Sequence, residues 1–304
     1  MRHTLEALRV AVAPPPPIAP APALRAPSDV FYTLRMRNHT MDALFYDVCA
    51  LSIAEIEALH ALLGAEGGVL IVSPEAGDPI RFLPTPEEFL AMPERPRALA
   101  VAGVGSSAIG TAAFARNVAA ALGKPVAGVV SGYGMRDMMA EAMGGWFWFR
   151  ARNLLFHDRS AAARASLVTG DGLSVLRDAY SPDTVALTAL FQANEPAFDI
   201  IATHSKGSLS VAEALYLSLD GAPAAAKRLM RSAHIITLGA AIYMPDQCRR
   251  VTDILGSGDW FGRINSHPEI DIDIVIDGAL HHTNTDIPAC LNVVEAVRQA
   301  VTLH

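Results

Sequence analysis

The chain has 304 residues, which is enough for one large α/β domain or for two modest ones. Its formal net charge of -7 and its 51% of hydrophobic residues are typical of a globular protein without the clustered basic surface that nucleic-acid binding requires. Its apolar runs are shorter than the ~18 residues of a membrane-spanning helix. We therefore expect neither a nucleic-acid partner nor a transmembrane segment.

The three cysteines, Cys49, Cys248 and Cys290, are widely spaced and stand among apolar residues. This spacing predicts neither a disulfide framework nor a metal site, and we expect buried free thiols. The N-terminus is too interrupted by proline for a signal peptide, so the expected location is cytoplasmic.

The chain divides into three predicted regions. Residues 1–28 are rich in proline and alanine, which predicts a flexible, extended tail. In residues 29–94, capping boxes at Ser52 and Thr85 predict two helices, and VLIVS at 69–73 predicts a strand. We expect this second region to be an α/β extension of the main sheet.

The third region, residues 95–304, alternates predicted strands with predicted helices. Its strands are continuously apolar, which is typical of a mostly parallel central sheet covered by helices on both faces. The predicted strands are 98–105, 125–132, 198–203, 233–239, 249–257 and 272–278. The predicted helices are 106–123, 184–193, 205–219 and 291–304. The expected fold class is therefore α/β.

One polar turn separates a buried strand from a helix in the segment DIIATHSKGSLSVAEALYLSL, residues 199–219. Ser205 lies in this turn, and Gly207 after it allows the helix to pack closely. A serine at such a position is either a helix cap or an exposed nucleophile.

An acid and two histidines favour the nucleophile. Asp259 follows the strand at 249–257, and His281 and His282 follow the last strand. Because ligands of parallel sheets bind beyond the carboxyl ends of the strands, these side chains are expected to lie near Ser205.

The strand, His-Ser-x-Gly turn and helix, with serine, acid and histidine in this chain order, resemble the serine hydrolases of the α/β-hydrolase fold, and the turn and C-terminal part resemble those of lipases. The likeness covers residues 95–304. It implies that Ser205 is the nucleophile, that Asp259 orients the base, and that His281 is the base, with His282 as the alternative. Thr203 departs from the family, which has glycine at this position.

The resemblance also implies an oxyanion hole. The main-chain N–H of Lys206, at the start of the helix, is one expected donor, and the side chain of this lysine is expected in solvent. The second donor is expected from Val104 or Gly105, in the turn after the first core strand.

The same glycine-rich turn, from Gly103 to Ala108, also fits the tolerant form of the dinucleotide-binding fingerprint. That fingerprint requires an acidic residue at the end of the next strand, and the strand at 125–132 has none. An NAD(P)-dependent oxidoreductase is therefore the less favoured alternative, and we expect no cofactor.

Four consecutive aromatic residues lie in a predicted insert, residues 144–180: Trp146, Phe147, Trp148 and Phe149. They form either a wall of an acyl-binding site or a buried domain junction. The first interpretation predicts an apolar substrate, such as a lipid-like or polyester-like ester.

The sequence thus predicts a cytoplasmic serine esterase, lipase-like, that acts through an acyl-enzyme on Ser205. The remaining alternative is a non-catalytic binding protein on a hydrolase fold, with the proline-rich tail as a docking segment.

Overall fold

The computed structural model of the chain describes residues 41–62, 65–103, 106–131, 153–154, 157, 180–194 and 198–303. The predicted tail at 1–28 and most of the predicted insert at 144–180 lie outside these ranges.

The described residues contain one eight-stranded sheet with the strand order β2-β1-β4-β3-β5-β6-β7-β8. Strand β1 is antiparallel to both of its neighbours, β2 and β4. All other neighbouring strands are parallel. The strands are β1 (Val69–Val72), β2 (Arg81–Leu83), β3 (Ala98–Val101), β4 (Val126–Val129), β5 (Ile200–His204), β6 (His234–Leu238), β7 (Arg250–Gly256) and β8 (Ile274–Ile276).

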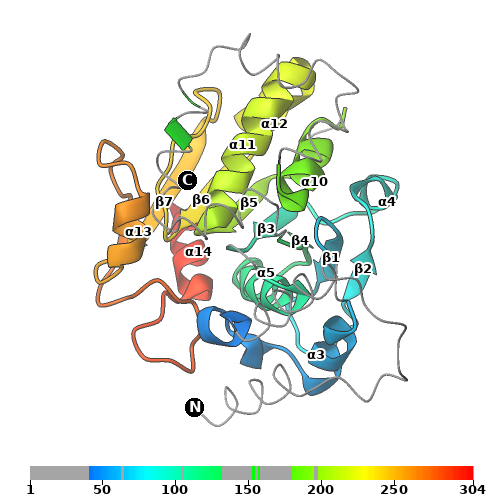
Figure 1. Cartoon of the computed structure of the whole chain (residues 1–304), viewed down its shortest axis with the longest axis vertical. Coiled ribbons are helices and arrows are strands. Elements are labelled where there is room, and N and C mark those ends of the chain that lie inside the picture. Colours follow the sequence, from blue (N-terminus) through cyan, green and yellow to red (C-terminus); the bar gives the residue numbers. More distant parts are fainter. Residues whose placement is uncertain are drawn as a thin grey trace, which may run out of the picture.

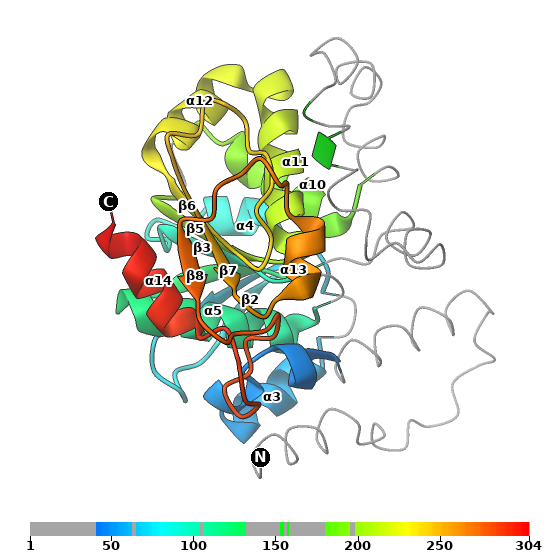
Figure 2. The same cartoon turned by 90° about the vertical axis from the view of Figure 1, so that its left-hand side faces the viewer.

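Helices cover both faces of this sheet (Figures 1 and 2). Side chains of α3 (Ile53–His60), α5 (Ala108–Leu122) and α14 (Val293–Thr302) share one hydrophobic core with the short helix η1 (Val48–Ala50). The opposite core is built from α4 (Pro86–Leu90), α10 (Pro182–Phe191), α11 (Lys206–Gly221) and α12 (Pro223–Ser232). The short helix α13 (Trp260–Asn265) follows the carboxyl end of β7. The expected α/β class with a mostly parallel central sheet is confirmed.

The capping residues that predicted two of the helices are present. Ser52 and Glu55 form a complete capping box at the start of α3, and the Thr85 side chain accepts a hydrogen bond from the N–H of Glu88 in α4. The strand expected at 69–73 is β1, which joins the main sheet near one edge. Elements before residue 95 are therefore part of the same sheet as those after it.

Among the elements named above, β2, α12, α13 and the short helix η1 were not expected. Strand β2 has only three residues and begins with an exposed arginine, so it lacks the apolar run that predicts a strand. A single residue, Ala222, separates α11 from α12, and Pro223 occupies the first turn of α12. Helix α13 has six residues, too few for a helical period to be visible.

The three cysteines differ from the expectation of buried thiols. Cys49 is exposed, and Cys248 and Cys290 are half-buried, so the expected burial of the thiols is wrong although all three are free. Cys49 lies in η1 at the surface, where its Sγ atom donates to the carboxylate of Asp47.

Within the described ranges, every helix is too short or too polar to pass through a bilayer.

The N-terminal described segment lies beside the loop that follows β8 (Figure 2). The N–H of Thr283 donates to the Phe45 carbonyl at 2.7 Å, and the Asn284 side chain donates to the Ala43 carbonyl at 2.7 Å. The Thr285 hydroxyl donates to the carboxylate of Asp47 at 2.9 Å. These bonds hold residues 43–47 against the loop that contains both histidines.

Candidate active site

Ser205 stands between the last residue of β5 and the first residue of α11, in a strained conformation. Its φ is 53° and its ψ is -123°, a combination that glycine adopts far more readily than a residue with a side chain. Such strain costs about 1–3 kcal/mol and is concentrated at functional sites. The N–H of Ser205 donates to the Leu238 carbonyl at 2.9 Å, which fixes the turn against the end of β6.

Gly207 and Thr203 explain how the helix leaves this turn. A Cβ atom added to Gly207 would lie 2.3 Å from the Val101 carbonyl oxygen, so only glycine lets α11 approach β3 this closely. Thr203, where the hydrolase pattern has glycine, is buried below the turn, and its hydroxyl lies 2.8 Å from the Ser208 hydroxyl. It also donates to the Ile236 carbonyl at 3.3 Å. These partners explain how a threonine is accommodated there.

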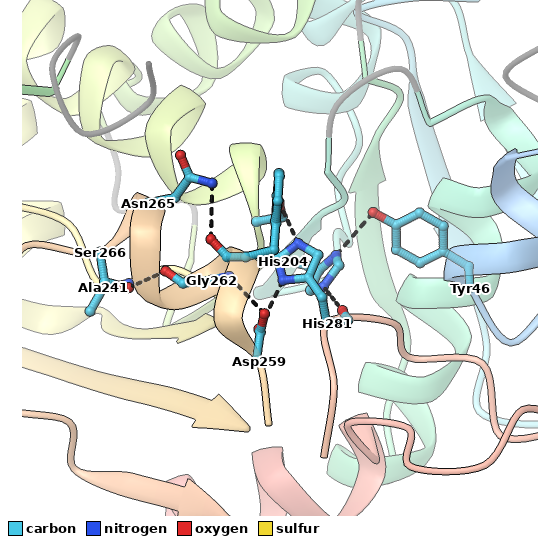
Figure 3. Close-up of polar contacts among 10 residues, drawn as sticks. Tyr46, His204, Ala241, Asp259, Gly262, Asn265, Ser266 and His281 are labelled. Carbon is cyan, nitrogen blue, oxygen red and sulfur yellow. Dashed lines mark hydrogen bonds and ion pairs between the residues drawn. The ribbon is translucent and has the colours of Figure 1, made fainter. Parts of the chain in front are cut away.

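The side chains of Ser205, His281 and Asp259 form a continuous row. His281 Nε2 lies 2.9 Å from the Ser205 hydroxyl. His281 Nδ1 lies 2.8 Å from Oδ2 of Asp259 (Figure 3). A carboxylate accepts hydrogen bonds, so it favours the tautomer with hydrogen on Nδ1 and leaves Nε2 free to accept from the serine. The three residues come from the ends of β5 and β7 and from the loop after β8.

Asp259 is held independently of the histidine. It is the N-cap of α13, and its Oδ1 atom accepts from the N–H of Gly262 at 2.6 Å (Figure 3). The aspartate is almost fully buried, so bulk water does not compete for either oxygen. Its orientation is therefore fixed by the helix as well as by His281.

Gly239 leaves room for the His281 ring. It follows β6 with a φ of 75°, and an added Cβ atom would lie 3.0 Å from His281 Cε1 and 3.5 Å from Asp259 Oδ2. The sequence predicts this glycine only as the last residue of a strand. Its contribution to the site could not be inferred before the histidine was positioned.

Two aromatic rings flank His281. The Phe261 ring is 4.7 Å away between centroids and the Phe45 ring is 6.4 Å away, both in edge-to-face arrangements. Phe261 comes from α13 and Phe45 from the N-terminal segment, and the sequence singled out neither. They give the imidazole a mostly apolar environment on two sides.

His282, the alternative base, points elsewhere. Its Nε2 atom lies 3.2 Å from the Pro288 carbonyl oxygen, and burial lowers the pKa of its imidazole. The histidine that contacts Ser205 is His281.

The Lys206 side chain, expected in solvent, is buried, so that expectation is wrong. Its Nζ atom lies 3.7 Å from Oδ2 of Asp183 and donates to the Ser181 hydroxyl at 3.4 Å. The same carboxylate oxygen accepts from the Ser210 hydroxyl at 2.9 Å. A buried ammonium requires such a counter-charge, and here α10 supplies it.

The two candidate oxyanion residues of the first loop, Val104 and Gly105, lie outside the described residues, as do Trp146, Phe147, Trp148 and Phe149. The residue before that loop lies beside the serine, because a Cβ atom added to Gly103 would be 3.3 Å from the Cβ atom of Ser205.

The imidazole of His204 is buried and connects two parts of the site. Its Nδ1 atom lies 3.1 Å from the Tyr46 hydroxyl, and its Nε2 atom lies 2.9 Å from the His281 carbonyl oxygen (Figure 3). The Tyr46 hydroxyl in turn accepts from the N–H of Gly103 at 2.5 Å. Neither His204 nor Tyr46 is among the site residues expected from the sequence.

The N-terminus of α5 is occupied by a carboxylate from the N-terminal segment. Asp42 accepts from the Ser107 N–H at 3.1 Å, from the Ser107 hydroxyl at 2.5 Å and from the Ser106 hydroxyl at 3.1 Å. Burial raises the pKa of Asp42 to about 6, although these hydrogen bonds oppose the shift. A Cβ atom added to Gly110 would lie 2.1 Å from an Asp42 oxygen, so no space separates the carboxylate from the helix.

Comparison with protein-family models finds no matching family, and comparisons with curated proteins and with solved structures find no significant match. The function is therefore inferred from the geometry of the side chains.

Proposed function

We propose that this protein is a serine hydrolase of the α/β-hydrolase fold, which cleaves carboxylic esters through an acyl-enzyme on Ser205. The observation that carries the proposal is the row in which His281 lies 2.9 Å from the Ser205 hydroxyl and 2.8 Å from the Asp259 carboxylate. The strained backbone of Ser205 supports it further, because a serine that only capped the helix would adopt ordinary extended dihedrals.

The proposed reaction begins when the Ser205 oxygen attacks the ester carbonyl and its proton moves to Nε2 of His281. Asp259 stabilises the imidazolium that forms. When the tetrahedral intermediate collapses, the bond to the alcohol breaks and Nε2 returns the proton to the departing oxygen. Water then attacks the acyl-enzyme by the same route and releases the acid and the free serine.

The negative charge on the carbonyl oxygen requires hydrogen-bond donors. The main-chain N–H of Lys206, at the positive end of α11, is the first proposed donor. The second is proposed from Val104 or Gly105, since Gly103 lies in contact with Ser205.

An apolar acyl or polyester-like substrate is part of the proposal. Three apolar side chains in the segments that follow Asp259 and precede His281 are exposed, with 62% of Trp260, 46% of Ile264 and 40% of Leu280 accessible. Trp260 and Ile264 are one turn apart on α13, and Leu280 directly precedes His281. Exposed large apolar residues are typical of surfaces that bind apolar ligands. A cytoplasmic location remains part of the same proposal.

The dinucleotide alternative is disfavoured by Asp42. In a dinucleotide-binding turn the pyrophosphate binds at the helix N-terminus after the first strand. In this chain a buried carboxylate already accepts the hydrogen bonds of Ser106 and Ser107 at that position. A second anion there would meet repulsion instead of free donors.

Labelling with a fluorophosphonate probe tests the proposed function. We expect the wild-type protein to be labelled and to hydrolyse a chromogenic short-chain ester, and Ser205→Ala to lose labelling and about 10⁴- to 10⁶-fold in turnover. Ser218→Ala is the matched control, because Ser218 is a buried serine of the same helix whose hydroxyl donates to Ala214. Labelling that persists in Ser205→Ala, or an unlabelled wild type with an intact circular-dichroism spectrum, would reject the proposal.

A further inference from the structure

We propose that Tyr46 and His204 are positioning residues that connect the main chain of Gly103 to the main chain of His281. The hydrogen bonds run from the Gly103 N–H to the Tyr46 hydroxyl, from that hydroxyl to His204, and from His204 to the His281 carbonyl. The inference rests on the proposed hydrolase function, and it assigns a task to two residues that never meet the substrate.

The donor and acceptor in each of these hydrogen bonds follow from the chemistry of the first and last groups. A carbonyl oxygen only accepts hydrogen bonds, so Nε2 of His204 carries the hydrogen that reaches His281. In the neutral ring, Nδ1 is then an acceptor, and the Tyr46 hydroxyl must donate to it. The Tyr46 oxygen remains free to accept from the Gly103 N–H. Each group has one role, and no second arrangement satisfies all of them with neutral side chains.

The surroundings keep both side chains neutral. Burial, assisted by the neighbouring charges of His281 and His282, lowers the pKa of His204 to about 3. Burial also raises the pKa of the Tyr46 hydroxyl. The Tyr46 and His204 rings meet edge to face with centroids 5.5 Å apart, and the Phe114 ring lies 6.0 Å from His204. The series of hydrogen bonds therefore keeps its direction at neutral pH.

This series of hydrogen bonds begins and ends at the two parts of the site that must be aligned. Gly103 is the last described residue before Val104 and Gly105, and its carbonyl accepts from the Ser131 hydroxyl at 2.9 Å. The peptide groups of Gly103 are thus fixed from both sides. At the other end, His204 holds the main chain of His281, whose ring must meet Ser205. An error of ~1 Å between such groups can lower the rate about 10²-fold.

Tyr46→Phe removes the hydroxyl and leaves the ring in place. We expect kcat for a chromogenic ester to fall about 10- to 100-fold while KM changes less than about twofold, because the substrate surface is intact and the alignment is lost. The matched control is Tyr216→Phe. It removes the hydroxyl of another buried tyrosine that contacts a histidine, 2.7 Å from His157 Nδ1, but it lies on α11 eleven residues beyond Ser205. A Tyr46→Phe variant with the kcat of the control would overturn the proposal.

Two variants of His204 separate its two hydrogen bonds. The amide nitrogen of glutamine reaches the position of the ring Nε2 atom, so His204→Gln retains a donor for the His281 carbonyl. His204→Asn instead places an acceptor near the ring Nδ1 atom and loses that donor. We expect the glutamine variant to retain about tenfold more kcat than the asparagine variant. Equal kcat values in two folded variants would contradict the assigned bond to His281.

Nitrogen-15 NMR of the histidine rings measures the protonation state and tautomer of His204 without any substrate. We expect His204 to remain neutral, with hydrogen on Nε2, from pH 5 to pH 8 in the wild-type protein. Titration of His204 in this range, or hydrogen on Nδ1, would overturn the proposal even if the variants fail to fold. An unlabelled wild type would instead mean that the hydrolase function has failed. A labelled wild type with an unaffected Tyr46→Phe variant would mean that only the positioning role has failed.

Discussion

The Asp259 carboxylate accepts a hydrogen bond from His281 on one oxygen and from the main chain of its own helix on the other. Oδ2 lies 2.8 Å from His281 Nδ1, and Oδ1 accepts from the Gly262 N–H at 2.6 Å. Gly262 itself allows this approach, since an added Cβ atom would lie 2.4 Å from Oδ2. The acid is therefore placed by the first turn of α13, and the histidine adjusts to it.

Asp259→Asn tests this placement. The side-chain amide still caps α13 through its oxygen and must then direct its NH₂ group at His281 Nδ1, which favours the wrong tautomer. We expect kcat to fall roughly 10³- to 10⁴-fold, with a change in unfolding free energy below about 1 kcal/mol. Steady-state kinetics and urea denaturation measure the two quantities. A variant that keeps more than a tenth of the wild-type kcat would show that the aspartate does not orient the base.

Ser205→Gly is expected to stabilise the protein while it abolishes activity. Glycine adopts a φ of 53° without strain, which releases about 1–3 kcal/mol and is partly offset by the ~0.5–1 kcal/mol of backbone entropy that glycine loses on folding. The expected net gain is about 1 kcal/mol. Ser205→Ala serves as the comparison, because it removes the same hydroxyl and keeps the strain. Equal midpoints of thermal unfolding for the two variants would contradict a strained turn.

Gly239→Ala is expected to displace the His281 ring. The new Cβ atom would meet Cε1 at 3.0 Å and Nδ1 at 3.2 Å, and the φ of 75° adds backbone strain of about 1–2 kcal/mol. We expect a loss of at least tenfold in kcat and a destabilisation of about 1–3 kcal/mol. Gly123→Ala is the control, because its φ of 66° brings the same strain but no atom lies within 4 Å of its added Cβ. If both variants lose stability and only Gly239→Ala loses activity, the loss of activity comes from the contact between the new methyl group and the His281 ring. An active Gly239→Ala variant would contradict this account.

Asp253→Asn is expected to change how stability depends on pH. Burial, with a smaller contribution from the charge of Asp273, raises the pKa of Asp253 to about 7, and the carboxyl accepts from the Thr237 hydroxyl. The pKa of Asp253 is higher in the folded protein than in the unfolded chain. The contribution of its protonated carboxyl to the free energy of unfolding is therefore fully present below about pH 4 and is lost as the pH rises towards 7. In that window the wild type loses up to about 1.4 kcal/mol per pH unit relative to the asparagine variant.

Urea denaturation at pH 5 and pH 8 measures this difference. The asparagine variant should gain stability relative to wild type between the two values. A constant difference in unfolding free energy would indicate that Asp253 titrates in the folded protein as it does in the unfolded chain.

The sequence predicted those parts of the fold and the site that depend on local patterns. Continuous apolar strands identified the parallel sheet, and the short polar turn at 203–207 identified the passage from β5 to α11. The positions of Asp259 and His281 after their strands were sufficient to expect both near Ser205, because carboxyl ends of parallel strands share one edge. The choice between His281 and His282 needed coordinates, since neighbouring residues in a loop can point in opposite directions.

Other features depend on contacts between residues far apart in the chain, which no local pattern encodes. Tyr46 and His204 are separated by 158 positions, and Tyr46 and Gly103 by 57. Lys206 looked like a solvent-exposed cation because its buried partner, Asp183, lies on another helix. Asp42 gave no signal either, because its role at α5 becomes visible only when the N-terminal segment is placed beside that helix.

The bonds between residues 43–47 and 283–285 also bear on how the chain folds during synthesis. Phe45 and Thr283 are 238 positions apart, and Ala43 and Asn284 are 241 apart. Translation produces the first partners long before the second, and contacts of such long range form late and slowly. The nascent chain should therefore build its central strands first and complete the candidate active site only after the loop that follows β8 has bound residues 43–47.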